Sequence, residues 1–412
     1  MTNNQLRLLW IVLAVSVWVF LSAAMGHLGV TIAFPKSIGS WKNFTEQGSG
    51  RPSTRECSCN NSPGNTYAAI EPNSLQSTPD TKVRMFILAN MRTGSSFVGD
   101  IFGSSSDVFY LFEPGLSLNE ALENLEDRPR VLSGVYLRML RRLYLCDFRQ
   151  LDFYLQWLSQ KDMFNLRKLA PRLHDLCSKS PAKGSCTITR EMATESCQQS
   201  KYLVVKSIRI PDIMLLMPMM EDEAIKLKVV HLVRDPRPMI ASRVIALTRT
   251  RVTWLSDSIR EFLCLYCKSN WENMVLGTQN PRIKDRYMFL RYEDAALDPV
   301  AAARRMHQFL GHSRVPESVL KWIDVNTKSA KPGRPLYSTA RNSSKAYRAW
   351  RDGFPFDTAK AIEGTGQCAG MMARMGYIPL VDEKHLRNSS LSLLTSIPSG
   401  NDDKNYDWMW DL

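Results

Sequence analysis

The sequence lacks the short motifs that mark several large enzyme classes. It has neither a GxxxxGK[ST] phosphate loop nor a GxSxG nucleophile elbow, so P-loop kinase and α/β-hydrolase chemistry are not supported. One Cys-x-x-Cys pair is present, Cys264 and Cys267, but no second Cys pair or His pair completes a four-ligand zinc site. The sequence therefore predicts no metal, and the cysteine pair is interpreted as structural.

Acidic residues are in the minority. The chain has 53 Lys and Arg against 40 Asp and Glu, which gives a formal net charge of +13. Such a surplus favours anionic partners through electrostatic steering. No nucleic-acid-binding motif accompanies it, so nucleic acid is not predicted as a partner, whereas a sulfated glycan and a nucleotide donor fit. A basic, soluble surface without such a partner is the alternative that charge alone leaves open.

Charge is missing from one long N-terminal run. Residues 8–25 carry no charged side chain, and apolar character persists to Phe34. This length is enough to span about 30 Å of hydrocarbon. We predict that residues 8–30 form a retained transmembrane signal-anchor, because the run is longer than a cleaved signal peptide needs. A short cytoplasmic tail, residues 1–7, then gives a single-pass type II membrane protein with a lumenal catalytic domain.

The rest of the chain divides by composition into three predicted parts. Residues 31–80 form a flexible lumenal stem, because most of this stretch is rich in Gly, Ser, Pro, Asn and Thr. Residues 81–380 form the catalytic domain, and residues 381–412 form a polar C-terminal tail. Sequons such as the one at Asn43 make the chain a predicted glycoprotein.

Nine cysteines in an oxidising lumen predict disulfides, and an odd count leaves at least one cysteine free or intermolecular. Cys57 and Cys59 lie in the predicted stem and could bridge two chains, so a homodimer stays open. Within the catalytic domain we predict two pairs, Cys186–Cys197 and Cys267–Cys368.

The first candidate ligand loop follows an apolar run, Val83–Ala89, that is short enough to be a buried strand. The run leads into Arg92-Thr93-Gly94-Ser95-Ser96, and an apolar pattern that suits a helix begins at Phe97. A strand, a turn with Gly and a helix N-terminus make an anion site, because free N–H groups and the helix dipole face the ligand. Arg92 adds a bidentate donor for phosphate or sulfate oxygens. Taken alone, an ordinary turn remains the commoner alternative.

A second stretch repeats this arrangement. Val229–Val233 is another buried-strand candidate, and Arg234-Asp235-Pro236-Arg237 ends it. Pro236 suits the first turn of a helix, which places Ser242 inside that helix. In open α/β sheets, ligands bind in the crevice outside the carboxyl ends of the strands. Two such loops predict a ligand with anionic groups at both ends.

These motifs carry a family resemblance. Residues 92–97 resemble the 5′-phosphosulfate loop of Golgi carbohydrate sulfotransferases, and residues 232–243 resemble their 3′-phosphate motif. The match is to the galactose, N-acetylglucosamine and N-acetylgalactosamine 6-O-sulfotransferase group, which includes keratan sulfate and chondroitin 6-sulfotransferases. Companion segments occur in the same order, at 108–114, 202–209, 287–294, 309–311, 339–344 and 350–351. Met91, Thr93 and Pro238 depart from the usual pattern without removing an anion-binding group.

The resemblance implies an α/β, P-loop-like sulfotransferase domain with a central, mostly parallel sheet flanked by helices. Strands are expected near 83–89, 203–208, 229–233 and 287–291. The implied activity is transfer of the sulfuryl group from 3′-phosphoadenosine-5′-phosphosulfate to the 6-hydroxyl of galactose, N-acetylglucosamine or N-acetylgalactosamine in a glycan or glycosaminoglycan. The implied location is the Golgi membrane. A kinase-like nucleotide-dependent transferase and a non-catalytic glycan-binding membrane protein are the alternatives.

The resemblance also assigns donor-binding residues. Arg92 and the loop that follows it would hold the 5′-phosphosulfate, while Arg234 and Ser242 would hold the 3′-phosphate. Trp350 would pack on adenine or simply hold its own loop in place. The complete predicted donor-binding set is Arg92, Thr93, Gly94, Ser95, Ser96, Phe97, Arg234, Asp235, Pro236, Arg237, Ser242, Arg341 and Trp350.

Glu113 is the predicted general base, with Arg92 and Ser96 as the other predicted catalytic residues. Its apolar and aromatic neighbours would desolvate the carboxylate and make it a better proton acceptor. The alternative is an ordinary glutamate at a strand end that pairs with an arginine. Glu293 is the second choice for the base, and His231 is predicted to be a core residue.

Overall fold

The computed structural model describes residues 82–122, 128–179, 186–248, 254–328 and 340–397. The predicted cytoplasmic tail, signal-anchor and stem lie outside the described residues, together with Cys57 and Cys59. Within the described ranges, no helix combines the length and the apolar character needed to cross a bilayer.

The centre of the fold is a five-stranded sheet in the order β2-β3-β1-β4-β5, in which every neighbouring pair is parallel. This confirms the predicted parallel α/β architecture. The four predicted strands are present, with each end within one residue of its predicted position, and β2 is a fifth strand beside them. The strands are β1 (Val83–Ala89), β2 (Val108–Phe112), β3 (Tyr202–Ser207), β4 (Lys228–Val233) and β5 (Tyr287–Arg291).

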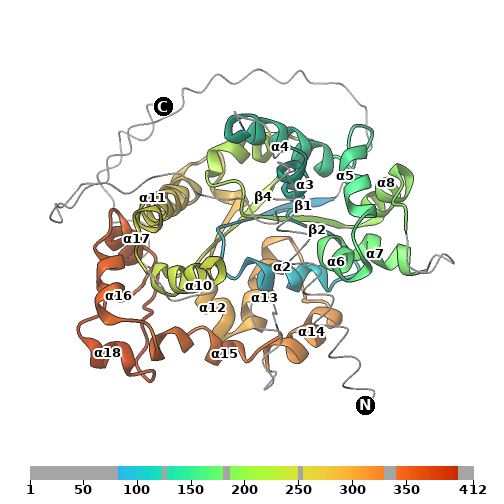
Figure 1. The fold of residues 1–412 in the computed structure, drawn as a ribbon. Coiled ribbons are helices and arrows are strands. Elements are labelled where there is room, and N and C mark those ends of the chain that lie inside the picture. The colour runs from blue at the N-terminus through green and yellow to red at the C-terminus, as the bar shows by residue number, and fades with distance from the viewer. Residues whose placement is uncertain (1–81, 123–127, 180–185, 249–253, 329–339, 398–412) are drawn as a thin grey trace, which may run out of the picture. The chain divides into compact units, whose positions relative to one another are not determined.

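Helices lie on both faces of the sheet; in Figure 1, α3 and α4 lie above it and α2, α12 and α13 below it. Strands covered on both faces are continuously apolar, as in Met85–Ala89, where no residue is more than 2% exposed. The α-helices are α2 (Ser95–Gly103), α3 (Gly115–Ala121), α4 (Arg128–Tyr144), α5 (Asp152–Ser159), α6 (Met163–Leu169), α7 (Pro171–Ser178), α8 (Arg190–Gln199), α9 (Met217–Glu221), α10 (Pro236–Thr248), α11 (Asp257–Gln279), α12 (Tyr292–Leu297), α13 (Pro299–Phe309), α14 (Glu317–Thr327), α15 (Ser343–Ala346), α16 (Phe356–Glu363), α17 (Cys368–Arg374) and α18 (Glu383–Arg387). The 3₁₀ helices are η1 (Ile213–Leu216), η2 (Lys284–Arg286) and η3 (Ala349–Asp352).

The strand order places a topological switch point between β1 and β4. These strands are direct neighbours, with Ala89 opposite Leu232. The chain leaves β1 toward β2 on one side of the sheet, whereas it leaves β4 toward β5 on the other side. Because the two connections diverge, a crevice opens at the carboxyl ends of these two strands, and this is where ligands bind in such sheets. Both predicted anion loops follow these two strands.

The disulfides correct one predicted pair and confirm the other. Cys267 and Cys368 are joined as predicted, with their Cα atoms 4.9 Å apart. The predicted Cys186–Cys197 pair is wrong, because each of these residues has a different partner: the observed bonds are Cys177–Cys186 and Cys146–Cys197. Cys186 returns to the end of α7 only nine residues after Cys177. Helix α8 brings Cys197 to Cys146, which lies just beyond the end of α4. Such pairing depends on helix packing, which residue spacing does not reveal.

The described residues beyond 380 pack on the domain instead of forming a separate tail. Leu386 in α18 is completely buried, and Leu394 forms an antiparallel bridge with Tyr377. The Arg351 side chain donates hydrogen bonds to four carbonyl groups of this segment, at His385, Leu386, Asn388 and Leu391. The segment therefore anchors η3, the element that carries Trp350.

Candidate active site

The first anion loop is a tight turn at the end of β1. The Thr93 N–H and hydroxyl both donate to the carbonyl of Asn90, at 3.3 and 2.8 Å. Gly94 then takes a left-handed conformation (φ 85°) as the N-cap of α2. A Cβ at this position would lie 2.2 Å from the Tyr292 ring, so both the backbone and the available space require glycine.

The loop presents the N-terminus of α2 to the crevice. The first four N–H groups of an α-helix have no partner within the helix, and Gly94 has no side chain that could accept from them. The first bond within this helix runs from the Val98 N–H to the Gly94 carbonyl. The N–H groups at the start of α2 and the positive end of its dipole therefore favour an anion in front of it.

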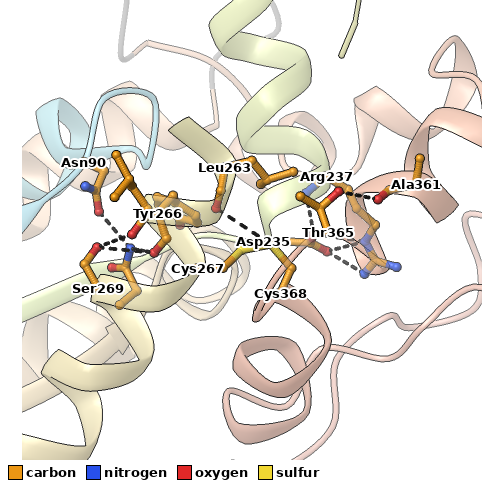
Figure 2. Close-up of a disulfide and its surroundings, with 12 residues drawn as sticks. Asn90, Asp235, Arg237, Leu263, Tyr266, Cys267, Ser269, Ala361, Thr365 and Cys368 are labelled. Carbon is orange, nitrogen blue, oxygen red and sulfur yellow. Dashed lines mark hydrogen bonds and ion pairs between the residues drawn. A yellow bond between two sulfur atoms is a disulfide. The ribbon is translucent and has the colours of Figure 1, made fainter. Parts of the chain in front are cut away.

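The second anion loop connects β4 to α10. Asp235 accepts hydrogen bonds from the backbone and the guanidinium of Arg237, which is completely buried and also pairs with Glu363. Asp235 and Arg237 thus hold the loop against α16 (Figure 2), while Arg234 lines a pocket. The Arg234 guanidinium lies 4.7 Å from the centre of the Tyr292 ring, an arrangement that stabilises a cation.

The two loops are joined directly. Arg92 donates from Nε to the Ser242 hydroxyl at 2.9 Å, and Arg234 donates from Nη1 to the Arg92 carbonyl, also at 2.9 Å. Each loop therefore positions an arginine of the other. Arg92 holds this geometry with a positive φ of 71°, which costs backbone energy in a residue with a side chain.

A pocket of about 660 Å³ lies over both loops. Its wall combines the two loops with aromatic side chains from later in the chain, chiefly Trp254, Trp350 and Phe354. Trp254 and Trp350 both pack edge-on against Phe354, with ring centroids 4.8 and 5.8 Å away. Three arginines and one aspartate line the pocket, so its charge favours an anion, and its aromatic side suits a flat ring.

Most predicted donor residues come together in this pocket. Those that line it are Arg92, Gly94, Ser95, Ser96, Phe97, Arg234, Ser242, Arg341 and Trp350. The predicted residues that do not line it are Thr93, Asp235, Pro236, Arg237 and Glu113. Among the described residues, no group of three or more His, Cys, Asp or Glu side chains is arranged to hold a metal ion.

Comparisons with known proteins decide the family. The family model described as a sulfotransferase domain matches residues 82–369. The chain belongs to the carbohydrate sulfotransferase family. Carbohydrate sulfotransferase 3 of Homo sapiens is 32% identical over 344 residues, which cover 75% of this chain and 70% of the relative. Carbohydrate sulfotransferase 1 of Mus musculus and carbohydrate sulfotransferase 6 of Homo sapiens are each 31% identical, covering 76% and 78% of this chain and 84% and 87% of the relatives.

The sulfotransferase is therefore an enzyme, as predicted, and it transfers a sulfuryl group to carbohydrate. This sets aside the kinase-like and non-catalytic alternatives.

Glu113 has a distinct environment in this enzyme. It follows β2 with a positive φ of 50° and is only 2% exposed.

The Glu113 carboxylate contacts two cations, at Lys206 and Arg209. Lys206 donates from Nζ to Oε1 at 2.5 Å, and Arg209 donates to Oε2. Burial lowers the pKa of Lys206, and the charge of Glu113 opposes that shift. The pairing with arginine that the sequence left as an alternative is thus present, and a lysine joins it.

Trp254 and Phe354 are pocket residues that were not predicted, because neither belongs to a motif and only folding brings them beside Trp350. Lys206 and Arg209 lay within a segment that carries the resemblance, but their pairing with Glu113 was not predicted. Glu293, the second choice for the base, is 3% exposed and accepts hydrogen bonds from the Asp235 N–H and the Tyr377 hydroxyl.

Proposed function

We propose that this sulfotransferase moves the sulfuryl group of 3′-phosphoadenosine-5′-phosphosulfate to the 6-hydroxyl of galactose, N-acetylglucosamine or N-acetylgalactosamine in a glycan or glycosaminoglycan. The observation that carries the proposal is the joining of two arginine-bearing loops, at Arg92 and Arg234, over one pocket. A donor with anionic groups at both ends matches two anion sites held at a set separation.

The pocket residues fit this donor. Arg92 and the N–H groups at the start of α2 would hold the 5′-phosphosulfate, with Ser95 and Ser96 beside them. Arg234 and Ser242 would hold the 3′-phosphate. The aromatic residues on the other wall, including Trp350, would take the adenine ring. Thr93, Asp235 and Arg237 support the loops from within the protein.

Transfer exchanges one sulfur–oxygen bond for another. The acceptor oxygen bonds to sulfur, the bond between sulfur and the 5′-phosphate oxygen breaks, and adenosine 3′,5′-bisphosphate leaves. Hydrogen-bond donors that are already positioned around the sulfuryl oxygens stabilise the charge that develops there. Arg92 and Ser96 are proposed for this role, because both line the pocket at the start of α2.

Glu113 is proposed as the base that takes the proton of the acceptor hydroxyl. It follows β2, while the Arg92 loop follows β1, and β3 lies between these strands. Strands spaced about 4.8 Å apart put the two elements roughly 10 Å from each other, which leaves room for a sugar above the end of β3. Lys206 and Arg209 would keep the Glu113 carboxylate in one orientation.

We also propose that the enzyme is a single-pass type II protein of the Golgi membrane with its catalytic domain in the lumen. The uncharged N-terminal run and the stem composition support this placement. Three disulfides join described residues, which fits an oxidising compartment. Protection of the catalytic domain from protease in intact Golgi vesicles, and its loss with detergent, is the expected result.

The function is tested with the full-length chain in detergent, radiolabelled donor and a panel of keratan, chondroitin and N-acetylglucosamine-terminated acceptors. We expect label in at least one acceptor, at the 6-position when the product is analysed by mass spectrometry and NMR. Label at another position would overturn the 6-O assignment. Donor binding without transfer to any hexose acceptor would overturn the proposed acceptor class.

A further inference from the structure

One long helix, α11, contacts both anion loops. Tyr266 and Asn270 are four residues apart, so their side chains lie on the same face of this helix. Figure 2 shows Asn90, from the first loop, near Tyr266, with the Cys267–Cys368 disulfide on the same helix. Both α11 side chains are buried, at 1% exposure each.

Tyr266 holds the backbone of the second loop. Its hydroxyl donates to the Arg234 carbonyl at 2.6 Å and accepts from the Arg234 N–H at 3.2 Å. One side-chain oxygen therefore satisfies both backbone groups of the residue proposed to bind the 3′-phosphate. These bonds hold the backbone of Arg234 in place, and its guanidinium reaches the Arg92 carbonyl from there.

Asn270 holds the first loop. Its amide Nδ2 donates to Asn90 Oδ1 at 3.0 Å, and Asn90 is the residue whose carbonyl accepts from Thr93 in the turn. Asn270 Oδ1 lies 2.9 Å from His231 Nε2, and His231 Nδ1 lies 2.7 Å from the Tyr287 hydroxyl. An amide oxygen can only accept, so Nε2 carries the proton and Nδ1 accepts from Tyr287. The chain of hydrogen bonds is complete with a neutral imidazole, in keeping with a His231 pKa that burial lowers to about 4.

The disulfide secures the helix between these two contacts. Cys267 directly follows Tyr266 and is joined to Cys368 at the start of α17. The contacts to the two loops thus come from one helix that is covalently tied to the domain. A rigid helix that touches both loops is suited to setting the distance between them.

We propose that Tyr266 and Asn270 are positioning residues that set the separation of the two anion loops to match a ligand with both a 5′ and a 3′ anionic group. This inference rests on the proposed function. The two side chains should have different effects on binding, because each one holds a different loop. Loss of the Tyr266 hydroxyl impairs only the 3′-phosphate contact, whereas loss of the Asn270 amide impairs the 5′ contact.

The experiment compares two probes, adenosine 3′,5′-bisphosphate and adenosine 5′-monophosphate, by titration calorimetry on the full-length chain. For Tyr266→Phe we expect the bisphosphate Kd to rise about 5- to 30-fold, as for one or two lost hydrogen bonds, with the monophosphate Kd within about twofold. For Asn270→Ala we expect both dissociation constants to rise together. In each variant the donor KM should rise. In Tyr266→Phe, kcat should change by less than about threefold, because the 3′-phosphate stays on the leaving nucleotide and the reacting groups are untouched.

Two matched controls separate positioning from packing. Asn273 lies on the same helix, is buried, and bonds Ile213 and Pro211 instead of a loop, so Asn273→Ala should lose stability without losing bisphosphate affinity. Tyr154 is completely buried, and its hydroxyl has no hydrogen-bond partner among the described residues, so Tyr154→Phe should change neither.

Equal effects of Tyr266→Phe on the two probes, or none on either, would overturn the role of Tyr266. Should that variant fail to fold, an unchanged donor KM in Asn270→Ala would overturn the inference by itself. A wild-type chain that does not bind the bisphosphate would instead contradict the proposed function, so the two failures are distinguishable.

Discussion

Arg234 donates a hydrogen bond from Nη1 to the carbonyl of Arg92 at 2.9 Å, which ties the loop after β4 to the loop after β1. Arg92 returns the connection through Ser242 in α10. Because each arginine is held by the opposite loop, the two anion sites form one unit. A ligand that spans the two sites therefore contacts both arginines of this unit.

Replacing either arginine should weaken donor binding. A bidentate contact to phosphate contributes about 1.5–3 kcal/mol, so Arg92→Ala and Arg234→Ala should each raise the Kd for adenosine 3′,5′-bisphosphate roughly 10- to 150-fold. Because the residues touch, the double variant should lose less than the sum of the single losses. Arg149→Ala, at a side chain 73% exposed, is the control. Unchanged affinity in both single variants would reject the two-loop site.

Gly94→Ala should damage the first loop. The left-handed backbone costs a residue with a Cβ about 1–2 kcal/mol, and the Tyr292 ring must also move. We expect a loss of at least ~2 kcal/mol in the free energy of unfolding, measured with denaturant, together with loss of donor binding. Gly134→Ala in α4 is the matched control, since nothing lies within 4 Å of a Cβ there. It should be neutral or stabilising by up to ~1 kcal/mol.

Glu113→Gln should lower turnover by at least about 100-fold, the range for loss of a general base, while the donor Kd stays within about twofold. The substitution also leaves the Lys206 ammonium buried beside a neutral amide, which can cost several kcal/mol. The double variant Glu113→Gln/Lys206→Met removes that unpaired charge and should recover stability without recovering turnover. Near-wild-type turnover in either variant would exclude Glu113 from proton transfer.

Glu293 should make stability depend on pH. Burial, and then the charge of Asp235, raise its pKa to about 7 from an ordinary value of 4.5. The folded state therefore binds more protons than the unfolded chain between these two values, and the free energy of unfolding falls as pH rises through that window. The loss is complete above pH ~7 and is on the order of 3 kcal/mol.

Glu293→Gln keeps an acceptor for the Asp235 N–H and removes the titration. We expect it to raise Tm at pH 8 relative to the wild type and to have little effect at pH 5, measured by calorimetry. Glu383→Gln, at a side chain 63% exposed, should leave the difference between the two pH values unchanged. If the Tm of Glu293→Gln stays the same between pH 5 and pH 8, the wild-type Tm should fall over that range. A wild-type Tm that does not fall would contradict the assignment.

Much of the fold was readable from local patterns. Val83–Ala89 and Tyr287–Arg291 coincide with the predicted strands, because short, mainly apolar runs of this length suit strands that are covered on both faces. The turn at Gly94 and the helix start at Pro236 were also predictable, since each depends on the backbone preferences of one or two residues.

Contacts between distant segments were not readable in this way. Cys186 and Cys197 were predicted as a pair, yet each bonds a cysteine that folding brings closer. Trp254 and Phe354 join the pocket from separate parts of the chain, and no motif marks them. The stretch after residue 380 looked like a tail, because its few apolar side chains find their partners only in the folded domain.

By itself, the sequence determined the strands, the two arginine loops and the resemblance, because short-range backbone and hydrophobic preferences act within a few residues. Only the tertiary structure decided that Arg234 bonds the Arg92 carbonyl, that Glu113 contacts Lys206 and Arg209, and that α11 holds both loops. These relationships join residues far apart in the chain. They exist because parallel strands bring their carboxyl ends to one edge of the sheet, and helix packing selects which side chains meet there.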